Sequence, residues 1–252
     1  MSFVTIAVQC HNYQRRLCWM LSSLCHQSQP DLVAVDIAYL TGNGTPATES
    51  LIDFYGQRMP IRGSAYTDLR SFQKRGYTRN RQLRQCTTDW ILFADCDMVY
   101  HPEYFWRLGE ELLSQHATAT HMLSSGRWST EKEPTNTLVN RTISTTPELI
   151  PDAFQQVTIL PKARRRNVGA GFSQLINMHH APHAGFYVES GKSRDWSWNR
   201  RYHKTRSDIQ FRKRMNRLGG RRQSLPEWFT DGLIHLNHER DNEVKYHLET
   251  QR

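Results

Sequence analysis

The chain has 252 residues, 38% of them hydrophobic, and carries a formal net charge of +9 with seven Trp, ten Tyr and ten Phe. A chain of this length can bury one substantial core, and its large aromatic side chains argue against a disordered protein. The positive charge attracts anionic partners (nucleic acid, acidic lipid head groups or nucleotide diphosphates) without choosing among them.

The first residues of the chain and its cysteines indicate the cellular compartment in which we expect the protein. Residues 1–8 lack a basic region and are followed by polar Gln9, which indicates a first strand rather than a signal peptide. The five cysteines are odd in number and have no CxxC spacing, as is typical of a reduced protein. No apolar run has the length of a membrane span. We expect a cytoplasmic protein, and the charge leaves open a peripheral contact with an anionic membrane.

The first half of the chain alternates strand and helix patterns. Residues 3–8 predict a strand, and the apolar residues between Leu17 and Leu24 recur at helical spacing. After Pro30, the apolar run 32–35 predicts a second strand that ends at Asp36, and residues 41–48 predict a loop.

A third strand is predicted over residues 90–94, where the apolar run Trp-Ile-Leu-Phe-Ala stops at Asp95-Cys96-Asp97. Strands of this unalternating kind, each followed by a helix, predict an α/β fold with a mainly parallel central sheet flanked by helices. The second half is less regular. Residues 124–150 predict a long loop that could close over a ligand, and residues 208–218 predict an amphipathic helix.

Asp95 and Asp97 stand where a buried strand ends, at the usual ligand-binding edge of an open α/β sheet. Two carboxylates placed so closely repel each other unless a cation neutralises them. A hard divalent ion takes oxygen ligands and can connect the carboxylates to the phosphates of a departing diphosphate. The alternative is a pair of solvated aspartates at an ordinary strand end, but the apolar strand before them favours the metal site.

These residues belong to a longer pattern. Gly76-Tyr77-Thr78-Arg79-Asn80, followed by the segment 89–98, resembles inverting glycosyltransferases of the GT-A fold, family 2 type. The Asp-Cys-Asp-Met version is similar to the catalytic domains of chondroitin polymerases and β-1,4-galactosyltransferases. The resemblance implies one GT-A domain over residues 1–252, with a nucleotide-sugar-binding half (1–115) and an acceptor-binding half (116–252).

The resemblance also implies donor contacts. Three of them lie at the end of the first strand, at Gln9, Cys10 and His11. Asp36, at the end of the second strand, is implied as an acidic contact to uracil. The sequence Asp36-Ile37-Ala38-Tyr39 departs here from the family's Asp-Asp-Gly-Ser. Asp95 contacts the donor as well as the metal. Arg79 becomes a contact to the nucleotide or its diphosphate, since a guanidinium binds phosphate oxygens in pairs. The alternative for Arg79 is a solvated helix face.

Two further matches lie near the end of the chain. Asp208 corresponds to the family's general base, although Ser207 replaces the Glu that usually precedes it. The alternative role of Asp208 is a helix cap. The segment 234–241 resembles the end of the catalytic domain, where a His supplies a metal ligand. Alignment with His-x-x-Asp chooses His238 over His235. A His beside carboxylates suits Mn²⁺ better than Mg²⁺.

The expected function is a metal-dependent inverting glycosyltransferase that uses Mn²⁺ (or Mg²⁺) and moves a sugar from a UDP-sugar, or another nucleotide sugar, to an acceptor hydroxyl of a glycan. One alternative is a nucleic-acid-binding protein that uses the basic segments 164–166 and 212–222, but the chain has no RNP, zinc-finger or helix-turn-helix pattern, so no specific nucleic acid is expected. Another alternative is a GT-A-fold nucleotidyltransferase or retaining transferase. A nucleotidyltransferase needs a Gly-rich phosphate loop after the first strand, where residues 9–12 have none.

Overall fold

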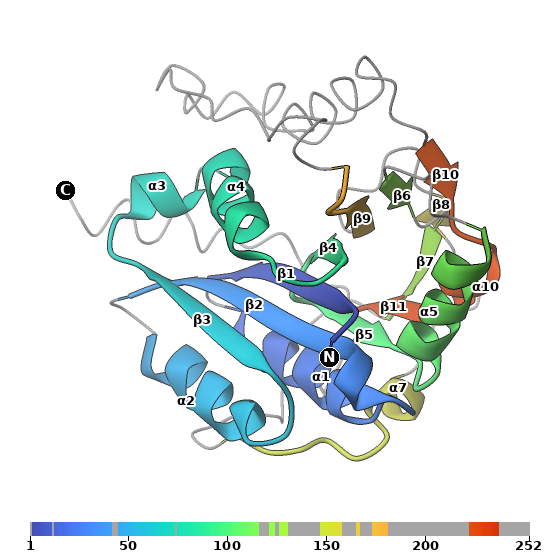
Figure 1. The fold of residues 1–252 in the computed structure, drawn as a ribbon. Coiled ribbons are helices and arrows are strands. Elements are labelled where there is room, and N and C mark those ends of the chain that lie inside the picture. The colour runs from blue at the N-terminus through green and yellow to red at the C-terminus, as the bar shows by residue number, and fades with distance from the viewer. Residues whose placement is uncertain are drawn as a thin grey trace.

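The computed structural model of the chain describes residues 2–11, 13–41, 45–73, 75–115, 121–123, 126–130, 147–157, 165–166, 173–180 and 222–236. These residues form a seven-stranded sheet and a smaller four-stranded sheet, with helices packed around them (Figure 1). No helix in these ranges is both long and apolar enough to cross a membrane.

The larger sheet consists of β1 (Val4–Cys10), β2 (Val33–Leu40), β3 (Ile61–Tyr66), β4 (Trp90–Ala94), β6 (His121–Leu123), β9 (Ser173–Asn177) and β10 (Arg222–Ser224). Its strand order is β10-β6-β9-β4-β1-β2-β3. Neighbouring strands from β3 to β4 run parallel, whereas β9 is antiparallel to both β4 and β6. The predicted α/β class is confirmed, with a central sheet that β9 makes mixed.

Helices cover both faces of the parallel strands. Helices α1 (Gln14–Cys25) and α2 (Thr45–Gly56) lie on one face, and α3 (Leu69–Gln73) and α4 (Arg75–Gln85) lie on the other (Figure 1). A 3-10 turn, η1 (Pro30–Leu32), leads into β2.

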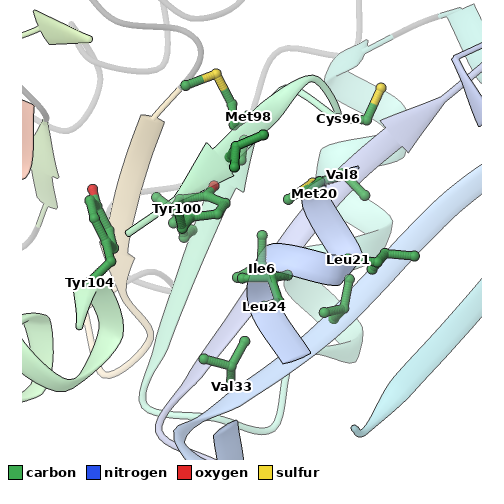
Figure 2. Close-up of a cluster of buried hydrophobic side chains, with 14 of the residues drawn as sticks. Ile6, Val8, Met20, Leu21, Leu24, Val33, Cys96, Met98, Tyr100 and Tyr104 are labelled. Atoms are coloured by element: carbon green, nitrogen blue, oxygen red, sulfur yellow. The ribbon is translucent and has the colours of Figure 1, made fainter. Parts of the chain in front are cut away.

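The alternation of side chains along β1 separates two apolar clusters. Ile6 and Val8 belong to the main cluster together with Leu24 of α1 (Figure 2), whereas Ala7 packs with Leu83 of α4. Successive residues of a strand point to opposite faces, so a strand that is covered on both sides has no polar face. This is why β4 is apolar throughout and β1 is mostly apolar, with Thr5 and Gln9 as its polar residues. Each fully buried Leu stabilises the fold by about 1.5–3 kcal/mol.

Strand β2 is longer than predicted. It continues four residues past Asp36 to Leu40, with Asp36 opposite Ala7 of β1 and Arg62 of β3. The prediction that the strand ends at Asp36 is therefore wrong, because a polar residue can remain inside a strand when neighbouring side chains supply its hydrogen bonds. The loop predicted over 41–48 is also shorter, since α2 begins at Thr45.

The smaller sheet consists of β5 (Met98–Tyr100), β7 (Gly126–Ser129), β8 (Arg165–Arg166) and β11 (Leu233–His235), in the order β5-β11-β7-β8. Because β5 follows β4 after three residues, the chain passes from the large sheet to the small one through Asp95, Cys96 and Asp97. Strand β11 lies between β5 and β7, so the end of the described chain returns to this crossing point (Figure 1).

Aromatic residues pack behind the smaller sheet. Helices α5 (Tyr104–Gln115) and α10 (Trp228–Asp231) contribute most of them, with Tyr104 5.1 Å from Tyr100 and 5.3 Å from Phe229 between ring centroids. Burial raises the pKa of both Tyr100 and Tyr104. These rings hold β5 and β11 together from one side.

The segment predicted as a loop over 124–150 contains regular structure. Residues 126–129 form β7, and residues 147–150 lead into α7 (Ala153–Gln156) along α1. The Tyr55 hydroxyl donates to the Glu148 carbonyl (2.7 Å), and the Ile150 N–H donates to Ser22 Oγ (3.0 Å). The ends of the segment are thus fastened to the domain, while residues 131–146 lie outside the described ranges.

Candidate active site

Asp95 and Asp97 lie at the carboxyl end of β4, where β1 also ends. The Asp95 side chain is 37% exposed and that of Asp97 is 8% exposed. Between them, Cys96 is buried in the main apolar cluster (Figure 2). A hydrogen bond with Cys10, at the end of β1, and burial both raise the pKa of Cys96. The inward Cys96 side chain fixes the turn from which the two carboxylates project.

His235 lies against the second aspartate. Its Nε2 is 3.1 Å from Asp97 Oδ2, and its side chain is 12% exposed. The backbone holds this contact in place, since His235 is opposite Met98 in the β5–β11 pair and its carbonyl accepts from the Thr130 N–H at 3.0 Å. The Leu236 N–H donates to the Asp97 carbonyl at 2.8 Å. Asp97 and His235 are thus joined through both main chain and side chain.

Arg127 of β7 lies near the first aspartate. Its Nη1 is 3.8 Å from Asp95 Oδ2 and 3.3 Å from Met98 Sδ, and its side chain is 12% exposed. Each aspartate therefore faces a different side chain of the smaller sheet: Asp95 faces a guanidinium, and Asp97 faces an imidazole.

Arg79 is buried on α4, so the alternative of a solvated helix face does not hold. Its guanidinium lies 5.1 Å from the ring centroid of Phe93 and donates to Gln174 Oε1 at 3.3 Å. Phe93 is two residues before Asp95, and Gln174 of β9 is its cross-strand partner. The Arg79 guanidinium therefore lies beside the last residues of β4, which directly precede Asp95.

The three predicted contacts after the first strand differ in environment. Gln9 and Cys10 belong to β1, and His11 follows it. The Gln9 side-chain amide donates to the Phe72 carbonyl, and the His11 ring lies 5.9 Å from that of Phe72 in an edge-on arrangement. Gln9 and His11 thus line the carboxyl edge of the sheet next to α3, whereas Cys10 is buried in the core.

Asp36 lies inside β2 and not at its end as predicted, and its carboxylate pairs with a neighbouring strand. Its carboxylate is 1% exposed, accepts from the Arg62 guanidinium, and lies 3.4 Å from Ser64 Oγ. Arg62 also donates to the Gln85 carbonyl at the end of α4 (2.7 Å), so the ion pair fastens α4 to the sheet. Asp36 thus lies in the middle of β2 and is enclosed, which disfavours the contact to uracil that the resemblance implies.

Asp208 and His238 lie outside the described residues, so their predicted roles remain predictions. Of the two histidines considered as metal ligands, His235 is the one that the described structure places beside Asp97. Residues 9, 11, 95 and 97 lie at the carboxyl ends of the neighbouring parallel strands β1 and β4, and Arg79 of α4 contacts Phe93 near the end of β4.

Arg127 was not predicted. It lies in a stretch that the composition assigns to a loop, and no spacing links it to Asp95. Only the pairing of β7 with β11, between strands about a hundred residues apart in the chain, brings it to this position.

The donor atoms at this edge suit a divalent cation. Two ligands bound to one octahedral ion at about 2.1 Å and at right angles lie about 3 Å apart. The 3.1 Å between Asp97 Oδ2 and His235 Nε2 is a hydrogen-bond distance, and it is also close to this ligand spacing. Within the described ranges, no three His, Cys, Asp or Glu side chains are grouped to hold a metal ion. Further ligands would therefore come from the bound donor or from residues outside those ranges.

Solved structures of low sequence identity share this fold. TarS from S. aureus in complex with UDP-GlcNAc aligns with a TM-score of 0.62 at 14% identity, covering 95% of this chain and 59% of that one. A longer TarS structure aligns with a TM-score of 0.62 at 14% identity, covering 93% of this chain and 36% of that one. The mannosyltransferase PcManGT from Pyrobaculum calidifontis, in complex with GDP-Man and Mn²⁺, aligns with a TM-score of 0.58 at 14% identity, covering 98% of this chain and 61% of that one.

This chain therefore spans between about a third and three fifths of the length of these proteins. No curated protein sequence matches it significantly. The family model described as glycosyl transferase family 2 matches residues 5–149, which is more than half of the chain and includes β1 to β4, Arg79 and both aspartates. The chain has the GT-A fold and belongs to glycosyl transferase family 2.

Proposed function

We propose that this chain is a metal-dependent, inverting glycosyltransferase that moves a sugar from a nucleotide diphosphate donor to a hydroxyl of a glycan acceptor. The observation that carries the proposal is the contact between Asp97 and His235, beside Asp95, at the edge of the sheet where the strands of such folds bind ligands. Family membership supports sugar transfer as the reaction.

The structural relatives support a nucleotide-sugar donor. TarS has been solved with UDP and with UDP-GlcNAc, and PcManGT with GDP-Man and Mn²⁺. We propose a UDP-sugar as the donor and keep GDP-sugars as the alternative. Base recognition falls to the edge lined by Gln9 and His11, next to α3, since Asp36 is enclosed.

Asp97 and His235 would hold the cation, and Asp95 would lie beside it and contact the donor. When bound, a divalent cation neutralises charge on the diphosphate and so makes it a better leaving group. A carboxylate and an imidazole together favour Mn²⁺, with Mg²⁺ as the alternative. Arg79, buried next to β4, adds positive charge near the nucleotide phosphates.

Inversion requires one displacement. The acceptor oxygen attacks the anomeric carbon, the bond from that carbon to the diphosphate oxygen breaks, and a base takes the acceptor's proton. We assign the base to Asp208, at the start of a predicted helix, where the helix dipole favours the ionised carboxylate. The same charge that attracts anionic donors would also favour an acidic glycan or an anionic membrane surface, which remains a prediction from the net charge of +9.

Calorimetric titration with UDP and GDP tests the proposal. We expect one of these nucleotides to bind when Mn²⁺ is present and not when EDTA replaces it. Asp97→Asn should weaken this binding about 100-fold or more, and Glu103→Gln, at a partly exposed position just before α5, should leave it unchanged. If neither nucleotide binds the wild-type chain with Mn²⁺ or Mg²⁺, the proposal is wrong.

The role of Asp208 needs a separate readout. Asp208→Asn should abolish sugar transfer while the Mn²⁺-dependent nucleotide affinity stays within about twofold, since a general base acts only in the chemical step. NMR of the product should show an inverted anomeric centre. A retained configuration would reject the inverting mechanism and leave nucleotide-sugar binding intact.

A further inference from the structure

Arg127 and His235 reach the two aspartates from the same face of the smaller sheet. His235 is opposite Ser129 in the parallel β7–β11 pair, and Ser129 is two residues after Arg127. Residues two apart on a strand, and residues opposite each other on neighbouring strands, point to the same face. The two side chains therefore form one row that faces Asp95 and Asp97, with Arg127 at Asp95 and His235 at Asp97.

The contact between Arg127 and Asp95 is a long ion pair, and Arg127 also has other partners, among them Met98 Sδ. Arg–carboxylate pairs that serve structure commonly have N···O distances of about 2.7–2.9 Å and two parallel hydrogen bonds. Here the Nη1–Oδ2 distance is 3.8 Å, too long for a hydrogen bond, and the Asp95 side chain is 37% exposed. The guanidinium itself is mostly buried, so it has given up much of its hydration close to the site.

A bound donor would bring more negative charge to this row. The diphosphate would lie next to two carboxylates, and a cation held at Asp97 and His235 balances only part of that charge. A buried guanidinium on the Asp95 side is placed to balance more of it, and it can bind two phosphate oxygens at once.

We infer that Arg127 is a donor-binding residue whose guanidinium holds the diphosphate beside Asp95, so that the leaving group is bound by a cation at one aspartate and by Arg127 at the other. This inference rests on the proposed function. As the sugar–oxygen bond breaks, negative charge grows on the diphosphate, and Arg127 stabilises that charge more than it stabilises the intact donor.

The test compares nucleoside mono- and diphosphates. Affinities of UDP, UMP, GDP and GMP are measured by calorimetry with saturating Mn²⁺ for the wild-type chain, Arg127→Met and Arg127→Lys. The matched control is Arg107→Met, which removes an exposed guanidinium of α5 that pairs with Glu103. Thermal unfolding of each variant shows whether it is folded, and titration with Mn²⁺ alone reports on the metal site.

We expect Arg127→Met to reduce the preference for the diphosphate over the monophosphate about 10- to 100-fold, which is the range for one lost charged hydrogen-bonding group. Arg127→Lys should keep part of this preference, because it retains the charge without the paired donors. The affinity for Mn²⁺ alone should not fall in either variant, and Arg107→Met should behave as wild type.

Three outcomes overturn the inference. If Asp97→Asn abolishes nucleotide binding but Arg127→Met keeps the full diphosphate preference, the inference is wrong and the proposed function stands. The same conclusion follows if Arg127→Met weakens only the affinity for Mn²⁺ alone, since Arg127 would then act by orienting Asp95. If the wild-type chain binds no nucleotide with any divalent metal, both the proposed function and the inference fall.

Discussion

His235 Nε2 lies 3.1 Å from Asp97 Oδ2, although 138 residues separate the two in the chain. Strand pairing produces this contact. Because β11 runs antiparallel to β5 with His235 opposite Met98, the residue before Met98 is brought to the end of β11. The chain therefore builds its candidate metal site from two segments that meet only when the smaller sheet forms.

His235→Gln should weaken Mn²⁺ binding about 100-fold or more. Mutating a residue that only orients a metal ligand already lowers metal affinity about 10- to 100-fold. Calorimetry with Mn²⁺ measures this directly. His179→Gln is the matched control, because His179 is exposed and pairs with Asp89 before the start of β4, away from the site. His238→Gln, measured in parallel, distinguishes the two histidines. A loss of Mn²⁺ affinity in His238→Gln but not in His235→Gln would contradict the assignment of His235.

Asp36→Asn should destabilise the fold by about 1–3 kcal/mol and leave nucleotide affinity unchanged. The substitution removes a buried carboxylate that pairs with Arg62 and so loosens the contact between Arg62 and the end of α4. Urea unfolding gives the stability change, and calorimetry of the folded variant gives the affinity. The opposite result, a loss of UDP affinity with unchanged stability, would restore Asp36 as a contact to the base.

Tyr55→Phe should cost about 1–3 kcal/mol of stability and loosen residues 147–150. The Tyr55 hydroxyl lies 2.7 Å from Ser22 Oγ and 3.1 Å from Cys18 Sγ, and it donates to the Glu148 carbonyl. Hydrogen exchange at the Ile150 amide, which donates to Ser22 Oγ, should become faster. Tyr77→Phe, at an exposed position, is the control. Unchanged exchange at Ile150 would show that other contacts hold this segment.

Cys25 should react slowly with alkylating reagents in the folded protein. Burial raises its pKa from 9 to about 11, against a smaller opposing effect of Arg58. At about pH 8 its thiolate fraction is then about 100-fold lower than that of an ordinary thiol. A raised thiol pKa favours the neutral form in the fold, so its contribution to stability is present below pH 9 and is lost as the pH rises through about 11. Iodoacetamide labelling followed by peptide mass spectrometry, with the urea-unfolded chain as control, measures the rate. Equal labelling of folded and unfolded chains would contradict the raised pKa.

The local part of the site could be predicted from the sequence because it depends on neighbours in the chain. An apolar strand that stops at Asp95 and Asp97 indicates the edge of a parallel sheet, and Arg79 follows a family pattern only a few residues long. Asp36 shows where this reasoning fails. A carboxylate at the end of an apolar run has the same pattern whether it lies at the strand end or is enclosed within a longer strand. Arg62, on a different strand, makes the difference here.

The sequence alone determined the class of fold, the position of the aspartate pair and the family, since hydrophobic periodicity and short motifs are properties of contiguous residues. The tertiary structure decided which distant side chains meet that pair. His235 and Arg127 reach Asp97 and Asp95 through the pairing of β11 with β5 and β7. The free energy of such pairing comes from burying strands against one another. The local sequence of a strand therefore does not predict which other strand it will pair with.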